Sequence, residues 1–299
     1  MITQPQAPCA ASTRLPKLAS RLGHYAELMR LSKPIGILLL LWPTLWALAL
    51  AGASWADWPL VSIFVLGVIV MRSAGCVIND FADRQFDSQV ARTRNRPLAA
   101  AKLKPVEALG LFSLLCCCAL LLVLQLNQLT LCYAFAGAAL TLIYPFLKRY
   151  THWPQLGLGL AFSWGVPMAF AAQEAQVPWF AWILFATSVL WPLSYDSIYA
   201  LSDREDDRQI GVKSTVILFY ERSHQFIATF QTAFLLALLI VGLIFELKPF
   251  YYFSVLLVGF FFLYQQWLIK TISPELCHRA FLNNNWVGLT IFLGILSSL

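Results

Sequence analysis

Long apolar stretches are the feature that most constrains the fold of this chain. Nine of them recur along its 299 residues, most of them near the ~20 residues that a helix needs to cross the ~30 Å hydrocarbon core of a bilayer. Backbone amides in lipid must be satisfied internally, and runs without period-two alternation favour helices over a barrel. The sequence therefore predicts an all-α membrane protein, a bundle of about nine transmembrane helices. The nine stretches cover residues 36–53, 58–78, 106–126, 130–147, 155–173, 178–198, 224–245, 249–269 and 281–298.

The composition excludes an ordinary soluble domain. Hydrophobic residues make up 59% of the chain and charged residues only 12%, whereas soluble domains carry roughly 25% charged residues. The net charge of +6 does not indicate nucleic-acid binding, because the basic residues are spread over loops and mixed with carboxylates. We expect anionic lipid headgroups or a phosphorylated substrate as partners. The seven cysteines form no CxxC pair and are expected to be small core residues, and the sequence indicates no oligomeric state.

The distribution of Lys and Arg predicts the orientation. Twenty of the 21 precede the first span, lie near the inner end of the second, or fall in the connections that follow even-numbered spans. Only Lys248 lies on the other side. Because positive residues are retained in the cytoplasm, we place the N-terminus inside and the C-terminus outside. Residues 1–23 are expected to form a disordered cytoplasmic lead, with no apolar core of a signal peptide, and residues 24–299 the transmembrane domain.

Two acidic clusters lie at the ends of apolar helices, at residues 79–87 and 203–207. In each cluster the polar residues recur every four positions and therefore share one face of a helix. Carboxylates gathered at a membrane surface repel one another and lose hydration, so they need protons or cations. The residues with this spacing are Asn79, Asp83 and Asp87 in the first cluster and Asp203 and Asp207 in the second.

Oxygen ligands of this kind select hard cations. Mg²⁺ takes one or two carboxylates and completes its shell with water and substrate phosphate, so two facing clusters suit metal ions bridged by a diphosphate. An EF-hand is excluded because the loop has neither the glycine at its sixth position nor the terminal glutamate. Two other interpretations stay open. An ordinary polar loop would not explain the shared four-residue step, and the acids of a proton or sodium pathway tend to lie near the bilayer midplane.

Basic and aromatic residues on the same predicted side can bind phosphate oxygens. Tyr144 and Lys148 are one helical turn apart, and both donate hydrogen bonds to phosphate. Arg72 lies two turns before Asn79, deeper than a residue that only sets topology. The many aromatic rings of the helices can stabilise a cation while excluding water. The candidates for phosphate binding, each also explained by topology alone, are Arg72, Arg94, Arg96, Lys148, Arg149 and Lys213.

The two clusters resemble the motifs of the UbiA family of intramembrane prenyltransferases, NDxxDxxxD and DxxxD, which lie on cytosolic loops of a nine-helix bundle. The first motif matches residues 79–87 and the second residues 203–207, and the resemblance extends over about residues 24–299. Within the family, residues 33–44, 71–80 and 144–155 are most similar to bacterial members that prenylate 4-hydroxybenzoate in ubiquinone biosynthesis.

The resemblance implies Mg²⁺-dependent transfer of a polyprenyl group from polyprenyl diphosphate to C3 of 4-hydroxybenzoate, with release of diphosphate. It implies a multi-pass protein of the bacterial inner membrane, with a central cavity, cytosolic capping loops over that cavity and a lateral opening for the polyprenyl tail. Arg72 or Arg149 would hold the benzoate carboxylate, and Asp196 would accept the phenol proton. The implied Mg²⁺ ligands are Asn79, Asp83, Asp87, Asp203 and Asp207, and the implied diphosphate contacts are Tyr144, Lys148 and Lys213.

Two alternatives remain at this point. A related prenyltransferase with a naphthoate or haem-precursor acceptor would share the acidic motifs and differ around the acceptor pocket. A cation-coupled transporter would also show intramembrane acids. Paired Gly/Pro interruptions at corresponding depths would favour such a transporter, and the sequence has none.

Overall fold

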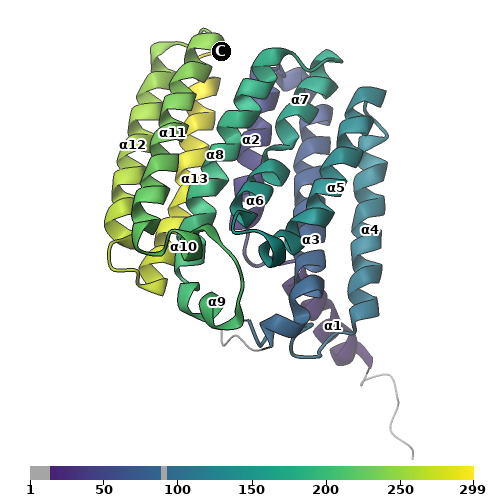
Figure 1. Ribbon diagram of the computed structural model, residues 1–299. Helices are drawn as coiled ribbons and strands as arrows, with labels where there is room; N and C mark the ends of the chain where they lie inside the picture. The colour runs from purple at the N-terminus through teal and green to yellow at the C-terminus, as the bar shows by residue number, and fades with distance from the viewer. Residues whose placement is uncertain (1–13, 89–92) are drawn as a thin grey trace, which may run out of the picture.

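The computed structural model describes residues 14–88 and 93–299, and within these ranges all regular structure is helical (Figure 1). The long helices are α1 (Arg14–Leu28), α2 (Ile35–Leu50), α3 (Trp58–Asp87), α4 (Pro105–Val123), α5 (Gln128–Tyr150), α8 (Trp179–Leu201), α11 (Ser223–Ile244), α12 (Pro249–Ile269) and α13 (Pro274–Leu296). The shorter helices are η1 (Trp55–Asp57), α6 (Pro154–Ser163), α7 (Gly165–Glu174), α9 (Arg204–Ile210), α10 (Thr215–Leu218) and η2 (Tyr220–Arg222).

Six helical segments are long and apolar enough to cross a membrane, namely α3, α4, α5, α6 together with α7, the helix ending in α11, and α12. Helices α2, α8 and α13 overlap the other three predicted spans. The all-helical, multi-pass architecture is therefore confirmed, whereas the count of nine spans stays a prediction.

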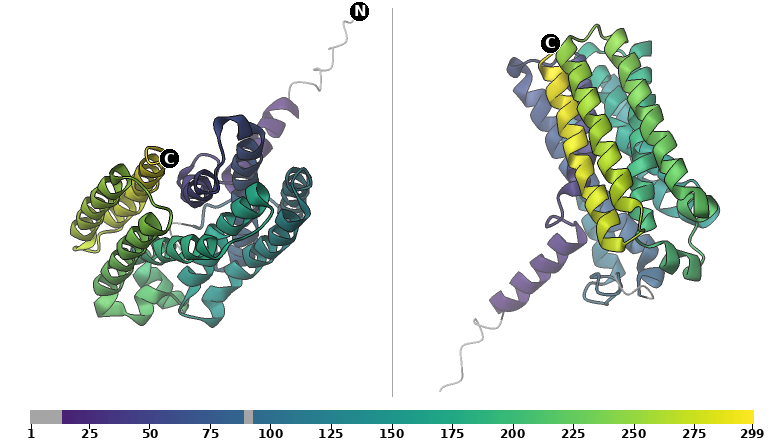
Figure 2. Two further views of the ribbon diagram at one scale, coloured as in Figure 1. Left: turned by 90° about the horizontal axis from the view of Figure 1, so that it is seen from above. Right: turned by 90° about the vertical axis from the view of Figure 1, so that its left-hand side faces the viewer.

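The long helices lie side by side, and the two ends of the bundle carry different elements (Figure 1). Helices α1, α9 and α10 lie at the same end as the last turns of α3, and the C-terminus lies at the opposite end (Figure 1). We call the end with α1, α9 and α10 the acidic end, because it carries residues 79–87 of α3 and residues 203–207 around α9. Seen from above, α11 to α13 lie on one side of the bundle and α3 to α5 on the other (Figure 2).

The first acidic cluster is helical, as its spacing predicts, because α3 continues to Asp87. The second cluster does not continue α8, which ends at Leu201. Asp203 is the N-cap residue of the separate helix α9. The backbone N–H of Asp207 donates to the carbonyl oxygen of Asp203 at 2.9 Å, so the helical four-residue step is kept.

One predicted span, residues 155–173, is broken into α6 and α7 at Trp164. Pro167 lacks an amide hydrogen and its ring clashes with the carbonyl group four residues earlier, which disfavours a continuous helix through residue 163. The indole N–H of Trp164 donates to the carbonyl oxygen of Tyr133 at 2.7 Å. The break is thereby fixed against α5.

Helix α1 begins inside the segment that we expected to be a disordered lead. It runs from Arg14 to Leu28, so the expected boundary after residue 23 does not coincide with the start of the helix, and residues 1–13 lie outside the described residues. Leu28 is fully buried, and the Tyr25 hydroxyl donates to Glu107 at the start of α4 at 2.9 Å. The end of α1 is thus packed onto the bundle by contacts that the polar composition of the lead did not reveal.

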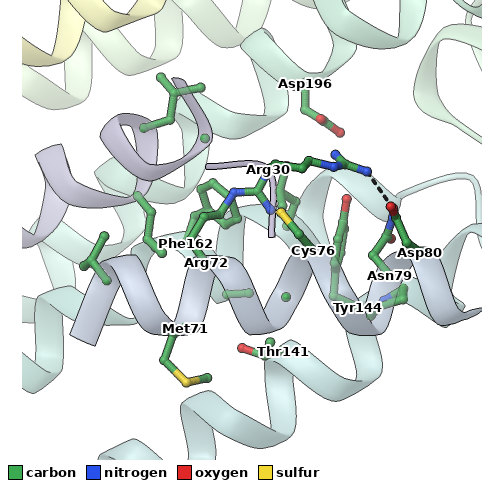
Figure 3. Close-up of a pocket in the computed structure, with 18 of the residues that line it drawn as sticks. Arg30, Met71, Arg72, Cys76, Asn79, Asp80, Thr141, Tyr144, Phe162 and Asp196 are labelled. Atoms are coloured by element: carbon green, nitrogen blue, oxygen red, sulfur yellow. Dashed lines mark hydrogen bonds and ion pairs between the residues drawn. The ribbon is translucent and has the colours of Figure 1, made fainter. Parts of the chain in front are cut away.

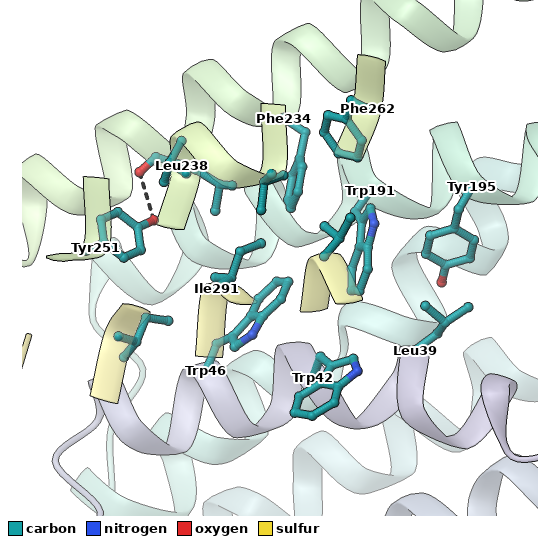
Figure 4. Close-up of a cluster of buried hydrophobic side chains, with 14 of the residues drawn as sticks. Leu39, Trp42, Trp46, Trp191, Tyr195, Phe234, Leu238, Tyr251, Phe262 and Ile291 are labelled. Atoms are coloured by element: carbon teal, nitrogen blue, oxygen red, sulfur yellow. Dashed lines mark hydrogen bonds between the residues drawn. The ribbon is translucent and has the colours of Figure 1, made fainter. Parts of the chain in front are cut away.

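Aromatic rings form the core between α2, α8 and α11 (Figure 4). Trp191 stacks on both Trp46 and Phe234, with ring centroids 5.3 Å and 6.0 Å away, and these two rings lie 6.5 Å from each other. Buried aromatic pairs contribute packing energy beyond the area that they remove from solvent. This core holds α8, which leads directly into the second acidic cluster, at a fixed position.

Candidate active site

A cavity of about 1640 Å³ brings together the residues that the sequence marks as functional. Its lining comes from both acidic clusters and from helices α2, α3, α5 and α8, which are far apart in sequence. It includes Arg96 and the eleven residues to which the resemblance assigns a role: Arg72, Asn79, Asp83, Asp87, Tyr144, Lys148, Arg149, Asp196, Asp203, Asp207 and Lys213. Arg94 is exposed and does not line the cavity, so its place among the phosphate-binding candidates is not supported.

Two arginines pair with Asp80 and Asp87 of the first cluster. Asp80, which is 2% exposed, accepts a hydrogen bond from Arg30 at 2.7 Å (Figure 3). It also accepts one from Arg96 at 3.1 Å. Arg96 also donates to Asp87 at 2.8 Å. Burial raises the pKa of Asp87 above its usual value, and Arg96 opposes this rise. Burial lowers the pKa of Arg30, but Asp80, Cys76 and Tyr199 together raise it, and the pKa is raised overall.

Asp83 lines the same cavity, and its two carboxylate oxygens have different surroundings. One of its oxygens pairs with the ammonium of Lys148, whereas Oδ1 is buried and has no hydrogen-bond partner among the described residues. The described side chains contain no group of three or more His, Cys, Asp or Glu arranged closely enough to hold a metal ion. The unpartnered carboxylate oxygen and the all-oxygen donor set nevertheless fit Mg²⁺, which completes its shell with substrate oxygens.

Backbone contacts between α5 and the loop after α9 bring the second cluster to the first. The N–H of Lys213 donates to the carbonyl oxygen of Lys148 at 3.1 Å, and its ammonium donates to the carbonyl oxygen of Tyr150 at 3.3 Å. The Ser202 hydroxyl lies 3.4 Å from Asp203. The loop is therefore held against the end of α5 that carries Lys148, so both clusters line one space.

The two arginines proposed for the acceptor carboxylate differ in their surroundings. Arg149 donates to the carbonyl oxygen of Ala82 at 2.6 Å and so links α5 to α3. The Arg72 guanidinium lies over the ring of Phe162, 5.5 Å from its centroid, and its buried Nε has no partner in the described part of the chain. Arg72 is therefore the better placed of the two to bind a ligand.

Asp196 and Tyr144 face the same space from opposite helices, α8 and α5 (Figure 3). Asp196 and Arg72 are close enough to the Tyr144 hydroxyl to interact with it electrostatically. Tyr144 and Lys148 are one turn apart on α5, as the sequence indicates, and both line the cavity. A donor for phosphate, a cation and a carboxylate thus face the same part of the cavity from two sides.

Sequence reasoning missed the role of Arg30 and underestimated Asp80. Arg30 precedes the first apolar stretch, where a basic residue is already explained by topology. Asp80 is off the four-residue step that marks the other acids. The available signal was that Asp80 directly follows Asn79 at the end of an apolar stretch, because a buried acid requires a cation.

Residues 40–291 match the sequence profile of the UbiA prenyltransferase family. The chain belongs to this family. A 4-hydroxybenzoate octaprenyltransferase from Vibrio vulnificus (strain CMCP6) is 53% identical over 271 residues, which cover 91% of this chain and 95% of that relative. The expected family is therefore confirmed, and membership of a UbiA prenyltransferase family favours transfer chemistry over cation-coupled transport.

Solved structures with the UbiA fold match the bundle at low sequence identity. The apo structure of a UbiA homologue from Aeropyrum pernix K1 has a TM-score of 0.75 at 23% identity, covering 88% of this chain and 97% of that one. A UbiA homologue from Archaeoglobus fulgidus bound to GPP and Mg²⁺ has a TM-score of 0.69 at 17% identity, covering 92% and 99%. These likenesses confirm the fold of the bundle.

Proposed function

We propose that this UbiA-family enzyme transfers a polyprenyl group from polyprenyl diphosphate to C3 of 4-hydroxybenzoate and releases diphosphate. The observation that carries the proposal is that one cavity holds both acidic clusters at the acidic end and Arg72 with Asp196 further along. Such a cavity accommodates a charged diphosphate and an acidic aromatic ring at once. The relative from Vibrio vulnificus, whose name states this chemistry, is 53% identical over nearly the whole chain.

The acidic end would bind the donor. Mg²⁺, which the Archaeoglobus fulgidus homologue holds together with GPP, would stabilise the charge of the leaving diphosphate. The residues that would hold it are Asn79, Asp83, Asp87, Asp203 and Asp207, all of which line the cavity. The unpartnered Oδ1 of Asp83 supports this assignment.

Lys148, Tyr144 and Lys213 would donate hydrogen bonds to the diphosphate oxygens. Lys148 pairs with Asp83 here, so its ammonium is already directed at the position where the donor would bind. Charge-assisted hydrogen bonds from an ammonium to phosphate oxygens are stronger than those between neutral groups. They would stabilise the diphosphate most when its negative charge develops, which is the condition for catalysis.

The acceptor would bind further along the cavity. As the allylic C–O bond breaks, its electron pair leaves with diphosphate, and aromatic walls such as Phe162 and Trp164 stabilise the cation and exclude water. C3 of the acceptor forms the new bond, and loss of its proton restores aromaticity. Arg72 would hold the carboxylate, and Asp196 would take the phenol proton as the new bond forms and return it to the oxygen when C3 loses its own proton.

The membrane placement belongs to the same proposal. The bundle would cross the bacterial inner membrane nine times with its N-terminus and the acidic end in the cytoplasm. The charge distribution supports this, because Lys248 is the single basic residue on the opposite side of the predicted spans.

Purified protein in lipid, given polyprenyl diphosphate, labelled 4-hydroxybenzoate and Mg²⁺, is expected to form the prenylated acid, identified by its mass. Asp83→Ala and Asp207→Ala should each lower the rate by about a hundredfold or more, since each removes charge stabilisation of the leaving group. Glu221→Ala is the matched control, because this acid is exposed and does not line the cavity. Full activity in EDTA would contradict the metal role, and product with a naphthoate but not with 4-hydroxybenzoate would contradict the acceptor.

A further inference from the structure

Unpartnered polar atoms mark two separate regions of the cavity. Seven buried side-chain nitrogen or oxygen atoms lack a hydrogen-bond partner in the described ranges. Four of them belong to residues that line the cavity, namely Arg72, Asp83, Tyr195 and Ser214. Asp83 and Ser214 lie near the acidic end. Arg72 is seven residues before Asn79 on α3, about 10 Å further along the helix.

The hydroxyl of Tyr195 is held in one direction. The residue is 1% exposed, and its ring packs edge-on against Trp191 at 5.3 Å and against Phe281 at 6.1 Å. These contacts leave the ring little freedom to turn the hydroxyl elsewhere. The hydroxyl points toward Leu39 of α2, and both residues line the cavity (Figure 4).

Arg72 lies against the same part of α2. A Cβ added to Gly36 would lie 2.4 Å from Nε of Arg72 and 2.9 Å from its Cζ, so only glycine allows the guanidinium this position. Gly36 precedes Leu39 by three residues, which places the two positions on one face of the helix. Asp196 and Arg72 are also close enough to the Tyr195 hydroxyl to interact with it electrostatically.

We propose that Tyr195 is a specificity-determining residue, whose hydroxyl donates with Arg72 to the carboxylate of the aromatic acceptor. A carboxylate accepts several hydrogen bonds and carries the charge that a guanidinium requires. A buried donor without a hydrogen-bond partner costs free energy. A bound carboxylate removes this cost by accepting the hydrogen bond, whereas a neutral group removes only part of it. The inference rests on the proposed function, which assigns an acidic aromatic acceptor to this end of the cavity.

The test compares Tyr195→Phe with wild type using two acceptors, 4-hydroxybenzoate and its neutral amide, 4-hydroxybenzamide. We expect the KM for 4-hydroxybenzoate to rise about tenfold, as for loss of a hydrogen bond to a charged group. The KM for polyprenyl diphosphate should not change, and the preference for the acid over the amide should fall. Tyr251→Phe is the matched control, because it removes a hydroxyl that donates to Leu238 at 2.9 Å outside the cavity.

A second variant reaches the same subsite from α2. Gly36→Ala displaces the Arg72 guanidinium without altering Tyr195, and the same acceptor-specific rise in KM is expected. Unchanged acceptor KM and unchanged preference in both variants would overturn the proposal. An equal rise in the KM of both substrates would also overturn it, since it indicates a structural role. A wild-type protein without prenylated product would instead contradict the proposed function.

Discussion

Asp80 and Asp83 lie less than one turn apart on α3 and have different partners. Asp80 is enclosed by Arg30 and Arg96, whereas Asp83 has Lys148 and an unpartnered oxygen. We therefore predict that Asp83→Asn raises the Mg²⁺ concentration for half-maximal activity by about tenfold or more. Asp80→Asn should leave that concentration unchanged and lower the thermal midpoint, because it weakens two ion pairs of a buried acid. Equal shifts of the Mg²⁺ requirement in both variants would show that Asp80 also binds the metal.

At the residue scale the sequence identified many of the polar side chains that line the cavity, but not which of them bond to each other. The four-residue steps placed Asp83 and Asp207 on helix faces, and both line the site. Arg30, Arg96 and Arg149 all look alike in sequence, because a basic residue on the cytoplasmic side needs no other reason. Their separate partners depend on helix packing, which no local pattern encodes.

Helix α13 is fixed by three consecutive asparagines that bond to three different helices. Asn283 accepts from Gln265 of α12, Asn284 from the indole of Trp191 on α8, and Asn285 from Trp42 on α2, at 2.9, 2.9 and 3.1 Å. Successive helical residues point about 100° apart, so one short stretch faces three neighbours. Inside lipid, hydrogen bonds of this kind direct helix association.

We predict that Asn284→Leu destabilises the bundle by about 1–2 kcal/mol, because it leaves the buried indole N–H of Trp191 without its acceptor. The measurement is the thermal midpoint in detergent for Asn284→Leu, Trp191→Phe and the double variant. The double variant should lose less than the sum of the two single losses. Strictly additive losses would show that this hydrogen bond contributes nothing to stability.

Element boundaries followed from sequence where a helical pattern was continuous. The acids of the first cluster extended α3 beyond its apolar stretch, and α3 indeed reaches Asp87. The break at Trp164 was not predicted, because the window around Pro167 stays apolar on both sides and hydropathy does not register a lost backbone hydrogen bond. Helix α1 was missed for a different reason, since its contacts with α4 lie outside any local pattern.

At the scale of the whole molecule the apolar surface faces outward. On α12, Phe253, Leu263 and Trp267 are each more than 60% exposed, whereas Gln265 on the same helix is fully buried. In water this distribution would be costly, and in lipid it places the polar side chains where they find partners. The composition alone predicts such an arrangement, because so few charged residues cannot cover a soluble surface.

The orientation of the bundle in the membrane is also a property of the whole molecule. Lys248 donates to the carbonyl oxygen of Leu299 at 3.2 Å, so the single basic residue assigned to the outer side lies beside the C-terminus, opposite the acidic end. Because basic residues are retained in the cytoplasm, we predict that alkaline phosphatase fused after Leu299 is active and that the same enzyme fused after Val212 is inactive. A cytoplasmic reporter at the two positions should give the reverse result. Phosphatase activity after Val212 and none after Leu299 would show that the bundle has the opposite orientation. Both acidic clusters would then lie on the side of the membrane where cytoplasmic Mg²⁺ and polyprenyl diphosphate do not reach them.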